Sequence, residues 1–236
     1  MERFAPMKLI ALLSWYDERP SWLAGVVASL AKLQCDHVVA MDGAYGLYPN
    51  GLPHSPPEQH AVIQHVCSSL EMSCTIHVPR EPWIGNEVEK RTAHFRLAEA
   101  FADPFEDWYF TIDADTFVDE AGVFRNRLEE TECDVAEVGF IERNGGIQSG
   151  GMLRCVHRAV PGLSYVGNHY TPMTTDGVDL QHPRTPCLGL PMIRVEHRTQ
   201  ERDRWRKESQ QGYYTRRDEM RSEICKEDIP GYVLAS

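Results

Sequence analysis

The sequence lacks three features that would place the protein in a membrane, on a nucleic acid or in a disulfide scaffold. The apolar stretch at residues 9–13 is far shorter than the ~18 residues of a spanning helix, and no later run approaches that length. A formal net charge of −11 disfavours a strong electrostatic contact with DNA or RNA. The seven cysteines contain no C-x-x-C pair and are odd in number, which is typical of reduced thiols. We therefore expect a soluble cytoplasmic protein that has no membrane partner and binds no nucleic acid strongly.

Internal repeats and low-complexity segments are also absent, and the pattern that remains is an alternation of strands and helices. Residues 8–13 and 37–41 indicate buried strands. Between them, Ser21 is suited to cap a helix whose apolar positions recur at helical spacing: Leu23, Val26, Val27, Leu30 and Leu33. A strand, a helix and a strand within about 35 residues predict a βαβ unit with parallel strands and a right-handed crossover.

The rest of the chain continues this alternation less regularly. Residues 45–57 predict a surface loop, and residues 145–151 (GGIQSGG) predict either a plain hairpin turn or a loop whose backbone can approach a ligand. The further elements that we expect are helices over 57–70 and 83–102 and strands over 75–78, 108–112, 135–141, 152–156, 164–171 and 192–196. With 236 residues and 42% hydrophobic content, the chain can form one compact α/β unit.

The stretch WYFTIDADTFVD at residues 108–119 combines a buried strand with two carboxylates. The strand runs directly into Asp113 and Asp115, and in an open α/β sheet ligands gather at the carboxyl ends of the strands. If the backbone stays extended through Ala114, both carboxylates point to the same side. Two such charges need a cation or hydrogen-bond donors nearby, so the pair predicts a site for a hard divalent cation and its phosphate ligand. A strand that ends in a plain acidic turn is the alternative.

Other charged residues lie next to the expected elements. Asp42 follows the second strand, and His197 follows the last one. Lys90 and Arg91 lie on the helix that precedes the acidic strand. A charged pair on a helix is also typical of a solvated face, and a histidine after a strand is often structural.

Three motifs, taken in their order and spacing, resemble one enzyme family. They are WIGNEVEKR at 83–91, DWYFTIDAD at 107–115 and EHRTQERDRWR at 196–206. Over residues 8–221 the chain is similar to the nucleotide-diphospho-sugar glycosyltransferases of the GT-A fold, within them to family 2, and more narrowly to glycosyltransferases of actinobacterial phages. The resemblance implies an α/β protein with a mixed Rossmann-like GT-A sheet, flanked by helices and followed by an arginine-rich helical segment.

The resemblance also implies how the chain is divided. A single GT-A domain at 1–221 would contain a nucleotide-sugar-binding half at 8–119, an acceptor half at 120–197 and a lid helix at 198–221. Residues 222–236 would form a C-terminal tail. The lid segment has few apolar residues and many arginines, which would gain charge-assisted hydrogen bonds from a diphosphate.

Carried over to the matching positions, the resemblance implies a metal site and a donor site. Asp113, Asp115 and His197 would hold Mn²⁺ or Mg²⁺, and the imidazole favours Mn²⁺. The residues expected to contact the nucleotide-sugar donor, a UDP-sugar first, are Asp17, Glu18, Asp42, Arg91, Asp113, Arg198, Arg202 and Arg206. Glu201 and Glu208 offer an alternative role for the last arginines, which is pairing on a solvated helix.

The general base and the acceptor are less sharply indicated. Inverting displacement at the anomeric carbon needs a base beside the acceptor hydroxyl, and residues 165–179 offer Asp176 and His169. Asp176 is favoured because its carboxylate is already deprotonated at neutral pH, and Asp179 or Glu142 comes next. Retaining enzymes share the fold and the acid pair, so the stereochemistry stays open. If the chain comes from a phage, a virion protein or a modified nucleobase is a candidate acceptor.

Three other classes of protein share parts of this pattern. A haloacid-dehalogenase-like phosphohydrolase would use Asp113 as its nucleophile, although its acidic strand usually lies near the N-terminus of the core and Phe117 replaces the usual Thr or Val. A sugar nucleotidyltransferase usually has a glycine-rich basic loop after its first strand, where this chain has SWYDERP. A non-catalytic sugar-nucleotide-binding protein would keep the pocket and lose the metal ligands.

Overall fold

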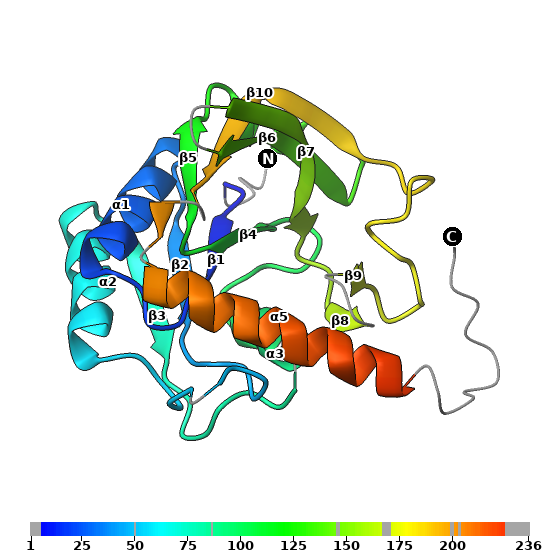
Figure 1. The fold of residues 1–236 in the computed structure, drawn as a ribbon. Helices are drawn as coiled ribbons and strands as arrows, with labels where there is room; N and C mark the ends of the chain where they lie inside the picture. The colour runs from blue at the N-terminus through cyan, green and yellow to red at the C-terminus, as the bar shows by residue number, and fades with distance from the viewer. Residues whose placement is uncertain are drawn as a thin grey trace.

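A mixed sheet of eight strands forms the centre of the protein in the computed structural model (Figure 1). The structure describes residues 6–49, 51–85, 87–144, 147–166, 171–198, 201–202 and 204–224. Within them, the strand order is β3-β2-β1-β4-β7-β6-β10-β5. These strands are β1 (Leu9–Ser14), β2 (His37–Met41), β3 (Ser73–His77), β4 (Trp108–Asp113), β5 (Thr116–Glu120), β6 (Val135–Asn144), β7 (Ile147–Arg158) and β10 (Leu188–His197).

The first half of the chain builds the parallel side of the sheet. β1 pairs in parallel with β2 and β4, and β2 pairs in parallel with β3, so the expected βαβ unit is confirmed. The crossover contains α1 (Pro20–Leu30) and the short 3₁₀ helix η1 (Ala31–Leu33). All six residues of β1 are buried, because strands flank both of its edges and helices cover both faces of the sheet.

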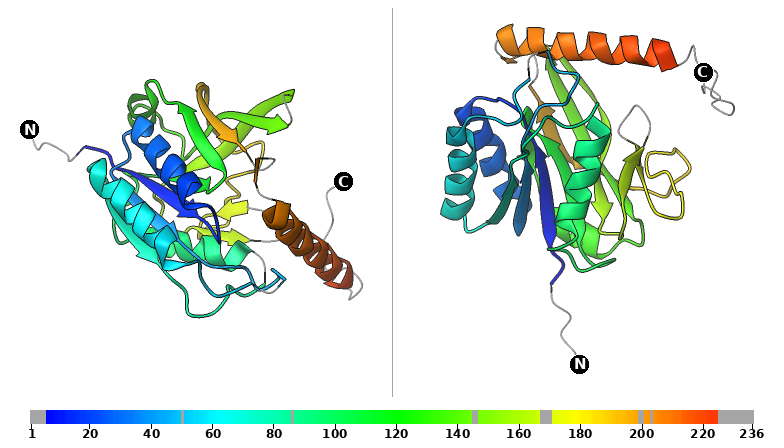
Figure 2. Two further views of the ribbon diagram at one scale, coloured as in Figure 1. Left: turned by 60° about the vertical axis from the view of Figure 1, so that its left-hand side comes forward. Right: turned by 90° about the horizontal axis from the view of Figure 1, so that it is seen from below.

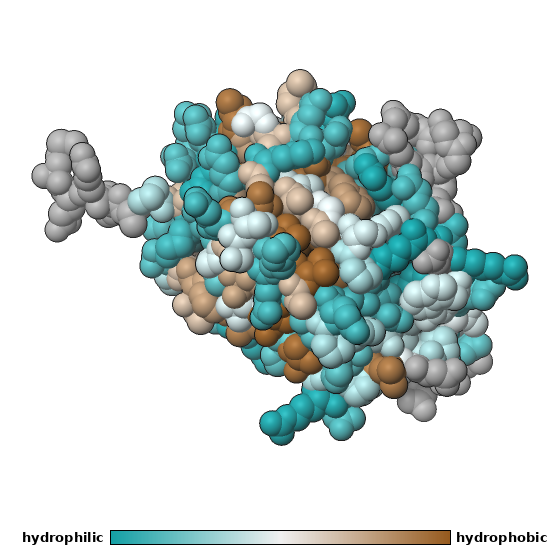
Figure 3. Space-filling model, turned by 90° about the vertical axis from the view of Figure 1, so that its left-hand side faces the viewer, coloured by the Kyte–Doolittle hydropathy of each residue, from teal (hydrophilic) through white to brown (hydrophobic). Residues whose placement is uncertain are grey.

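Helices lie on both faces of this parallel side. α1 packs against α2 (Pro57–Ser69) on one face, and α3 (Glu87–Ala98) contacts β1 and β2 from the other (Figure 2). On the outer surface that carries α1 and α2, apolar and polar residues are interspersed (Figure 3). The buried positions of α1 include Leu23, Val26, Val27 and Leu30, so its apolar stripe faces inward, as its helical spacing predicts.

The second half of the chain adds antiparallel strands. β7 pairs antiparallel with β4 and β6, while β10 pairs in parallel with β6 and antiparallel with β5 at the edge. α4 (Phe124–Glu129) follows β5. β8 (Ser164–Val166) and β9 (Thr171–Met173) form a separate ribbon that contacts α3. The expected fold class, a mixed α/β sheet flanked by helices, is therefore confirmed.

The last helix, α5 (Arg204–Ile224), lies across the carboxyl ends of the parallel strands (Figure 2). Tyr213 of α5 stacks on Tyr48 with ring centres 4.9 Å apart, and its hydroxyl donates to Glu87 at 3.2 Å. α5 is strongly polar, and none of the described helices is long and apolar enough to cross a membrane. Aromatic packing and hydrogen bonds therefore hold α5 over the sheet edge.

Three local expectations are wrong. Ser21 does not cap α1, because the helix starts at Pro20, whose missing N–H suits it to the first helical turn. The backbone does not stay extended through Ala114, since residues 114–115 form a turn between β4 and β5. Residues 147–151, expected in a hairpin turn or a ligand-binding loop over 145–151, belong to β7, which pairs antiparallel with β6.

Candidate functional site

A cavity of about 870 Å³ lies at the carboxyl ends of the parallel strands, and residues of α5 help to line it. Side chains of α3 and α5 line it, together with residues at the ends of β4, β6 and β10. Its volume lies within the range of small-molecule sites, and its position is the one where open α/β sheets bind ligands.

Asp115 and His197 meet in this cavity. Nε2 of His197 lies 2.9 Å from Oδ2 of Asp115. Asp115 occupies the turn between β4 and β5, and the pairing of β10 with β5 places His197 beside that turn. Burial disfavours the imidazolium, but the hydrogen bond to Asp115 and its charge outweigh burial and raise the pKa of His197. The two residues are thus held together by a charge-assisted contact.

Arg202, just before α5, bridges Asp115 and Glu18. Its Nη1 lies 3.1 Å from Oδ2 of Asp115, and its Nε lies 2.8 Å from Oε2 of Glu18. Burial raises the pKa of Glu18, and the charge of Arg202 acts against that rise. Two residues that the sequence assigned to the donor site therefore do meet, and they join the turn after β1 to the acidic turn.

Asp113 has a different partner from Asp115. Nη2 of Arg91 donates to both oxygens of Asp113, at 3.0 and 2.9 Å, and lies 3.7 Å from Glu87. α3 therefore brings Arg91 to the acidic strand. Asp113 ends β4 and its side chain is 42% exposed, whereas Asp115 lies in the turn that follows and its side chain is only 4% exposed.

The donor atoms of Asp115 and His197 suit a divalent cation. Mn²⁺ accepts carboxylate oxygen and imidazole nitrogen, and Mg²⁺ sites commonly combine one or two carboxylates with substrate phosphates and water. Among the described residues, no three His, Cys, Asp or Glu side chains come together as a metal site. Asp113, expected as a third ligand, is engaged by Arg91 in this structure. Asp115 and His197 therefore fit the cation as a two-residue site.

Two buried cations also line the cavity. Arg206, expected from the sequence, is 5% exposed, and its guanidinium lies 5.6 and 5.2 Å from the ring centres of Tyr16 and Tyr48. Lys90, expected on a solvated helix face, is only 1% exposed and donates to two backbone carbonyl oxygens. Sequence reasoning missed Lys90, because the pair Lys90-Arg91 resembles an ordinary charged surface.

The structure brings Glu142 to the cavity and places Asp176 elsewhere. Glu142 is in register with His197 across β6 and β10, and it lines the cavity. Asp176, the favoured base, lies in an exposed turn where its carboxylate accepts from the Thr174 hydroxyl. It is not among the described residues that line the cavity.

Asp179 and Arg198, two further predicted residues, lie apart from the cavity, and a third, His169, falls outside the residues that the structure describes. The carboxylate of Asp179 accepts the backbone N–H of Gln181 at 2.7 Å. Arg198 pairs with Glu196 at 2.6 Å and lines a separate small groove. The structure thus offers Arg202 and Arg206, rather than Arg198, to a ligand in the cavity.

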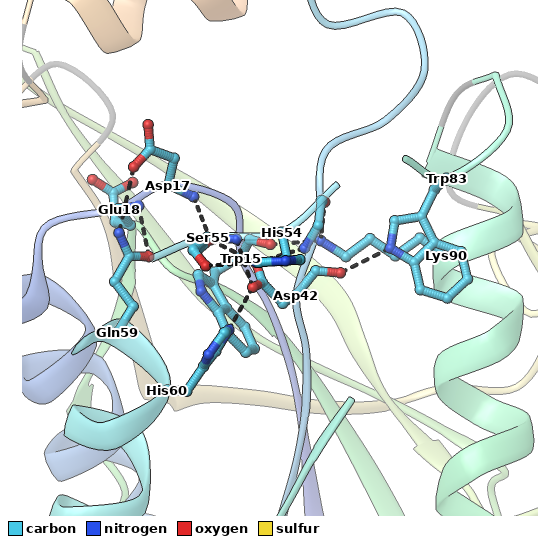
Figure 4. Close-up of polar contacts among 11 residues, drawn as sticks. Trp15, Asp17, Glu18, Asp42, His54, Ser55, Gln59, His60, Trp83 and Lys90 are labelled. Carbon is cyan, nitrogen blue, oxygen red and sulfur yellow. Dashed lines mark hydrogen bonds and ion pairs between the residues drawn. The ribbon is translucent and has the colours of Figure 1, made fainter. Parts of the chain in front are cut away.

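Asp42, expected to contact the nucleotide, belongs to a buried hydrogen-bond network (Figure 4). Its Oδ1 accepts the backbone N–H of Gly43 and the hydroxyl of Ser55, both at 2.6 Å. Its Oδ2 accepts the backbone N–H of Ser55 at 2.8 Å and Nε2 of His60 at 2.6 Å. Asp17, another predicted donor contact, joins the network because its N–H donates to the Ser55 hydroxyl at 2.8 Å. Neither acid is among the described residues that line the cavity.

The Asp42 network predicts a large stability effect of a small change. In Asp42→Asn, either orientation of the amide puts its NH₂ against a backbone N–H, of Gly43 or of Ser55, that cannot become an acceptor. We expect the free energy of unfolding to fall by about 2–3 kcal/mol, since a buried donor then lacks its acceptor. Denaturant unfolding measures this loss, with exposed Glu106→Gln as the control. Equal stability of the two variants would contradict the structural role of Asp42.

The mixed sheet, its helices on both faces and the cavity at the strand ends are consistent with the Rossmann-like GT-A fold class that the sequence resemblance implies. Among solved structures, the chain is similar to the crystal structure of S. aureus TarS, with 16% identity over 59% of this chain and 22% of that chain and a TM-score of 0.43. It is also similar to TarS 1-349, with 16% identity, 59% and 37% coverage and a TM-score of 0.42. The chain therefore spans well under half of these structures. No protein-family model and no curated protein matches it.

Proposed function

We propose that the protein is a metal-dependent glycosyltransferase that moves a sugar from a nucleotide-diphosphate sugar, a UDP-sugar first, to a hydroxyl acceptor with inversion. The observation that carries this proposal is the contact between Asp115 and His197 inside a cavity of about 870 Å³. A cation ligand pair at the carboxyl ends of parallel strands, with arginines beside it, suits a diphosphate ester.

The chemistry needs charge stabilisation of the leaving group. A divalent cation held by Asp115 and His197 would stabilise the negative charge that develops on the departing nucleoside diphosphate. Arg91 orients Asp113 through both carboxylate oxygens, which leaves Asp113 suited to accept hydrogen bonds from hydroxyl groups of the donor. The segment before α5 contributes Arg202, which would share the carboxylate of Asp115 with the cation.

Glu142 is the residue that we assign to activation of the acceptor hydroxyl. Glu142 lines the cavity from β6, the strand next to β10, and is in register with His197. A carboxylate there is within the chamber that holds the reacting sugar, and it can take the hydroxyl proton as the new glycosidic bond forms. Asp176 in its exposed turn is less suited to this task.

The alternatives predict different products. A phosphohydrolase that uses Asp113 as nucleophile is disfavoured, because Arg91 holds both oxygens of that carboxylate. A non-catalytic binding protein would use the same cavity without turnover. The product therefore separates the three classes: a transferase releases nucleoside diphosphate, a phosphohydrolase releases inorganic phosphate, and a binding protein releases neither.

The test is incubation with Mn²⁺ and, separately, UDP-, GDP- and dTDP-sugars, with detection of nucleoside diphosphate and of inorganic phosphate. We expect nucleoside diphosphate release from one donor, lost when EDTA removes the metal. Thermal unfolding identifies the donor independently, since a ligand at a hundred times its Kd stabilises by ~2.7 kcal/mol. Stabilisation without release of either product would favour the binding protein, and phosphate release would favour the hydrolase.

A further inference from the structure

Lys90 and Arg206 differ from Arg91 and Arg202, two other cations that line the cavity. Arg91 pairs with Asp113, and Arg202 pairs with Asp115. Across the described part of the chain, neither Lys90 nor Arg206 forms an ion pair with a carboxylate, although both side chains are almost fully buried. A buried cation without a counter-ion is costly, so a ligand of opposite charge would stabilise these two residues.

Lys90 leaves one donor for a ligand. Its Nζ donates to the carbonyl oxygen of Trp15, after β1, at 2.6 Å and to that of Gly43, after β2, at 2.9 Å (Figure 4). The ammonium also lies 5.3 Å from the ring centre of Tyr45. An ammonium has three N–H donors, and two carbonyl oxygens use only two of them. Neutral carbonyls and a ring supply hydrogen bonds and partial charge, but no full negative charge.

Arg206 leaves two buried nitrogens for a ligand. Its Nε and Nη1 are buried and have no hydrogen-bond partner among the residues that the structure describes. The guanidinium rests on Tyr48, whose ring centre lies 5.8 Å from that of Tyr45, the ring beneath Lys90. The neighbouring rings of Tyr45 and Tyr48 therefore contact Lys90 and Arg206, respectively. Buried donors without an acceptor destabilise the protein, and a ligand with several acceptor oxygens would satisfy them.

We propose that Lys90 and Arg206 form an anion site that binds the diphosphate of the ligand directly, without a metal ion. A diphosphate carries several acceptor oxygens and more than one negative charge, and these match four unfilled N–H donors on two cations. The nucleoside part of the ligand rests on the proposed function, whereas the anion site does not. The cation at Asp115 and His197 would then neutralise only part of the diphosphate charge.

Binding at this site is coupled to a proton. Burial is the main cause that lowers the pKa of Lys90 to about 7. The charges of Asp42 and Asp113 raise this pKa, and those of Arg91 and Arg206 lower it further. A bound anion favours the ammonium and raises this pKa. Binding therefore takes up a proton near and above pH 7, and affinity is full below that pH and falls as the pH rises above it.

The test is calorimetric titration of the full chain with pyrophosphate in EDTA at pH 7.5, in two buffers that differ in ionisation enthalpy. We expect metal-free binding with net proton uptake. Arg206→Gln should weaken binding at least tenfold, and Lys90→Met should weaken it and remove the proton uptake. Arg204→Gln is the matched control, because Arg204 lies on the same helix with its side chain 93% exposed.

Each outcome has a defined meaning. Absence of metal-free binding by the wild type, or an unchanged Kd in Arg206→Gln, overturns the anion site. Lys90→Met loses two hydrogen bonds to carbonyl oxygens and can fail to fold. In that case, proton uptake by the wild type in the two buffers and the Kd of Arg206→Gln for pyrophosphate decide whether the anion site exists. Nucleoside diphosphate release without metal-free pyrophosphate binding rejects this site and keeps the proposed function. If the wild type binds pyrophosphate without metal, Arg206→Gln weakens that binding and no sugar nucleotide is turned over, the anion site stands and the proposed function is rejected.

Discussion

Replacement of Asp115 by asparagine is expected to lower sugar transfer by ~10³-fold or more, since the charge stabilisation that a bound cation supplies is worth several kcal/mol. Asparagine keeps the shape of the side chain but removes the negative charge that faces His197 and Arg202. The dependence of donor affinity on Mn²⁺ should disappear as well. Single-turnover transfer and titration of the donor with and without Mn²⁺ measure the two effects.

The control for Asp115→Asn is Asp119→Asn. Asp119 lies on the neighbouring strand β5 with its side chain 48% exposed, and it pairs with Arg194 outside the cavity. Thermal unfolding of both variants separates loss of the site from loss of the fold. Metal-dependent donor binding that survives in Asp115→Asn would remove the cation site from this turn.

Replacement of Glu142 by glutamine should reduce turnover by ~10² or more while donor affinity stays unchanged, because a general base acts on the acceptor and not on donor binding. The comparison variant is Asp176→Asn, which changes the residue that sequence reasoning favours. Its exposed position predicts turnover near that of the wild type. Single-turnover transfer and donor titration on both variants are required. The reverse pattern, with turnover lost only in Asp176→Asn, would restore the assignment made from the sequence.

The parallel half of the fold was predictable because its signals are local. β2 has the expected bounds, and α2 and β4 each differ from expectation by one residue at one end. Runs of apolar β-prone residues and apolar residues at helical spacing indicate these elements without reference to the rest of the chain. The positions of Asp113 and Asp115 at a strand end follow from the same patterns.

β5 is an element that no local pattern predicted. Its sequence, TFVDE, follows an acidic turn and ends in two charges. It becomes a strand by pairing with β10, whose Arg194 is in register with Glu120. Such an edge strand depends on a partner that is distant in the chain, and strand propensity alone does not determine it. The same pairing places His197 beside Asp115.

Lys90 could have been suspected from its place on α3. The buried residues of this helix are Glu87, Lys90, Arg91, His94, Phe95 and Ala98. They form one helical stripe, so charged and apolar residues share the inward face. The helical spacing that places Lys90 on the same face as Phe95 and Ala98 could have indicated that its side chain points inward.

The sequence by itself determined the order of strands and helices, the fold class and the set of acids and arginines near the strand ends. Only the tertiary structure decided which of these charges meet. Arg202 and Glu18 are 184 residues apart in the chain, and Lys90 and Trp15 are 75 apart. Secondary structure follows from neighbours within a few turns, whereas burial and ion pairing depend on which distant segments pack together. That is why Asp115 has His197 and Arg202 as partners and Asp113 has Arg91, whereas Lys90 and Arg206 pair with no carboxylate in the described part of the chain.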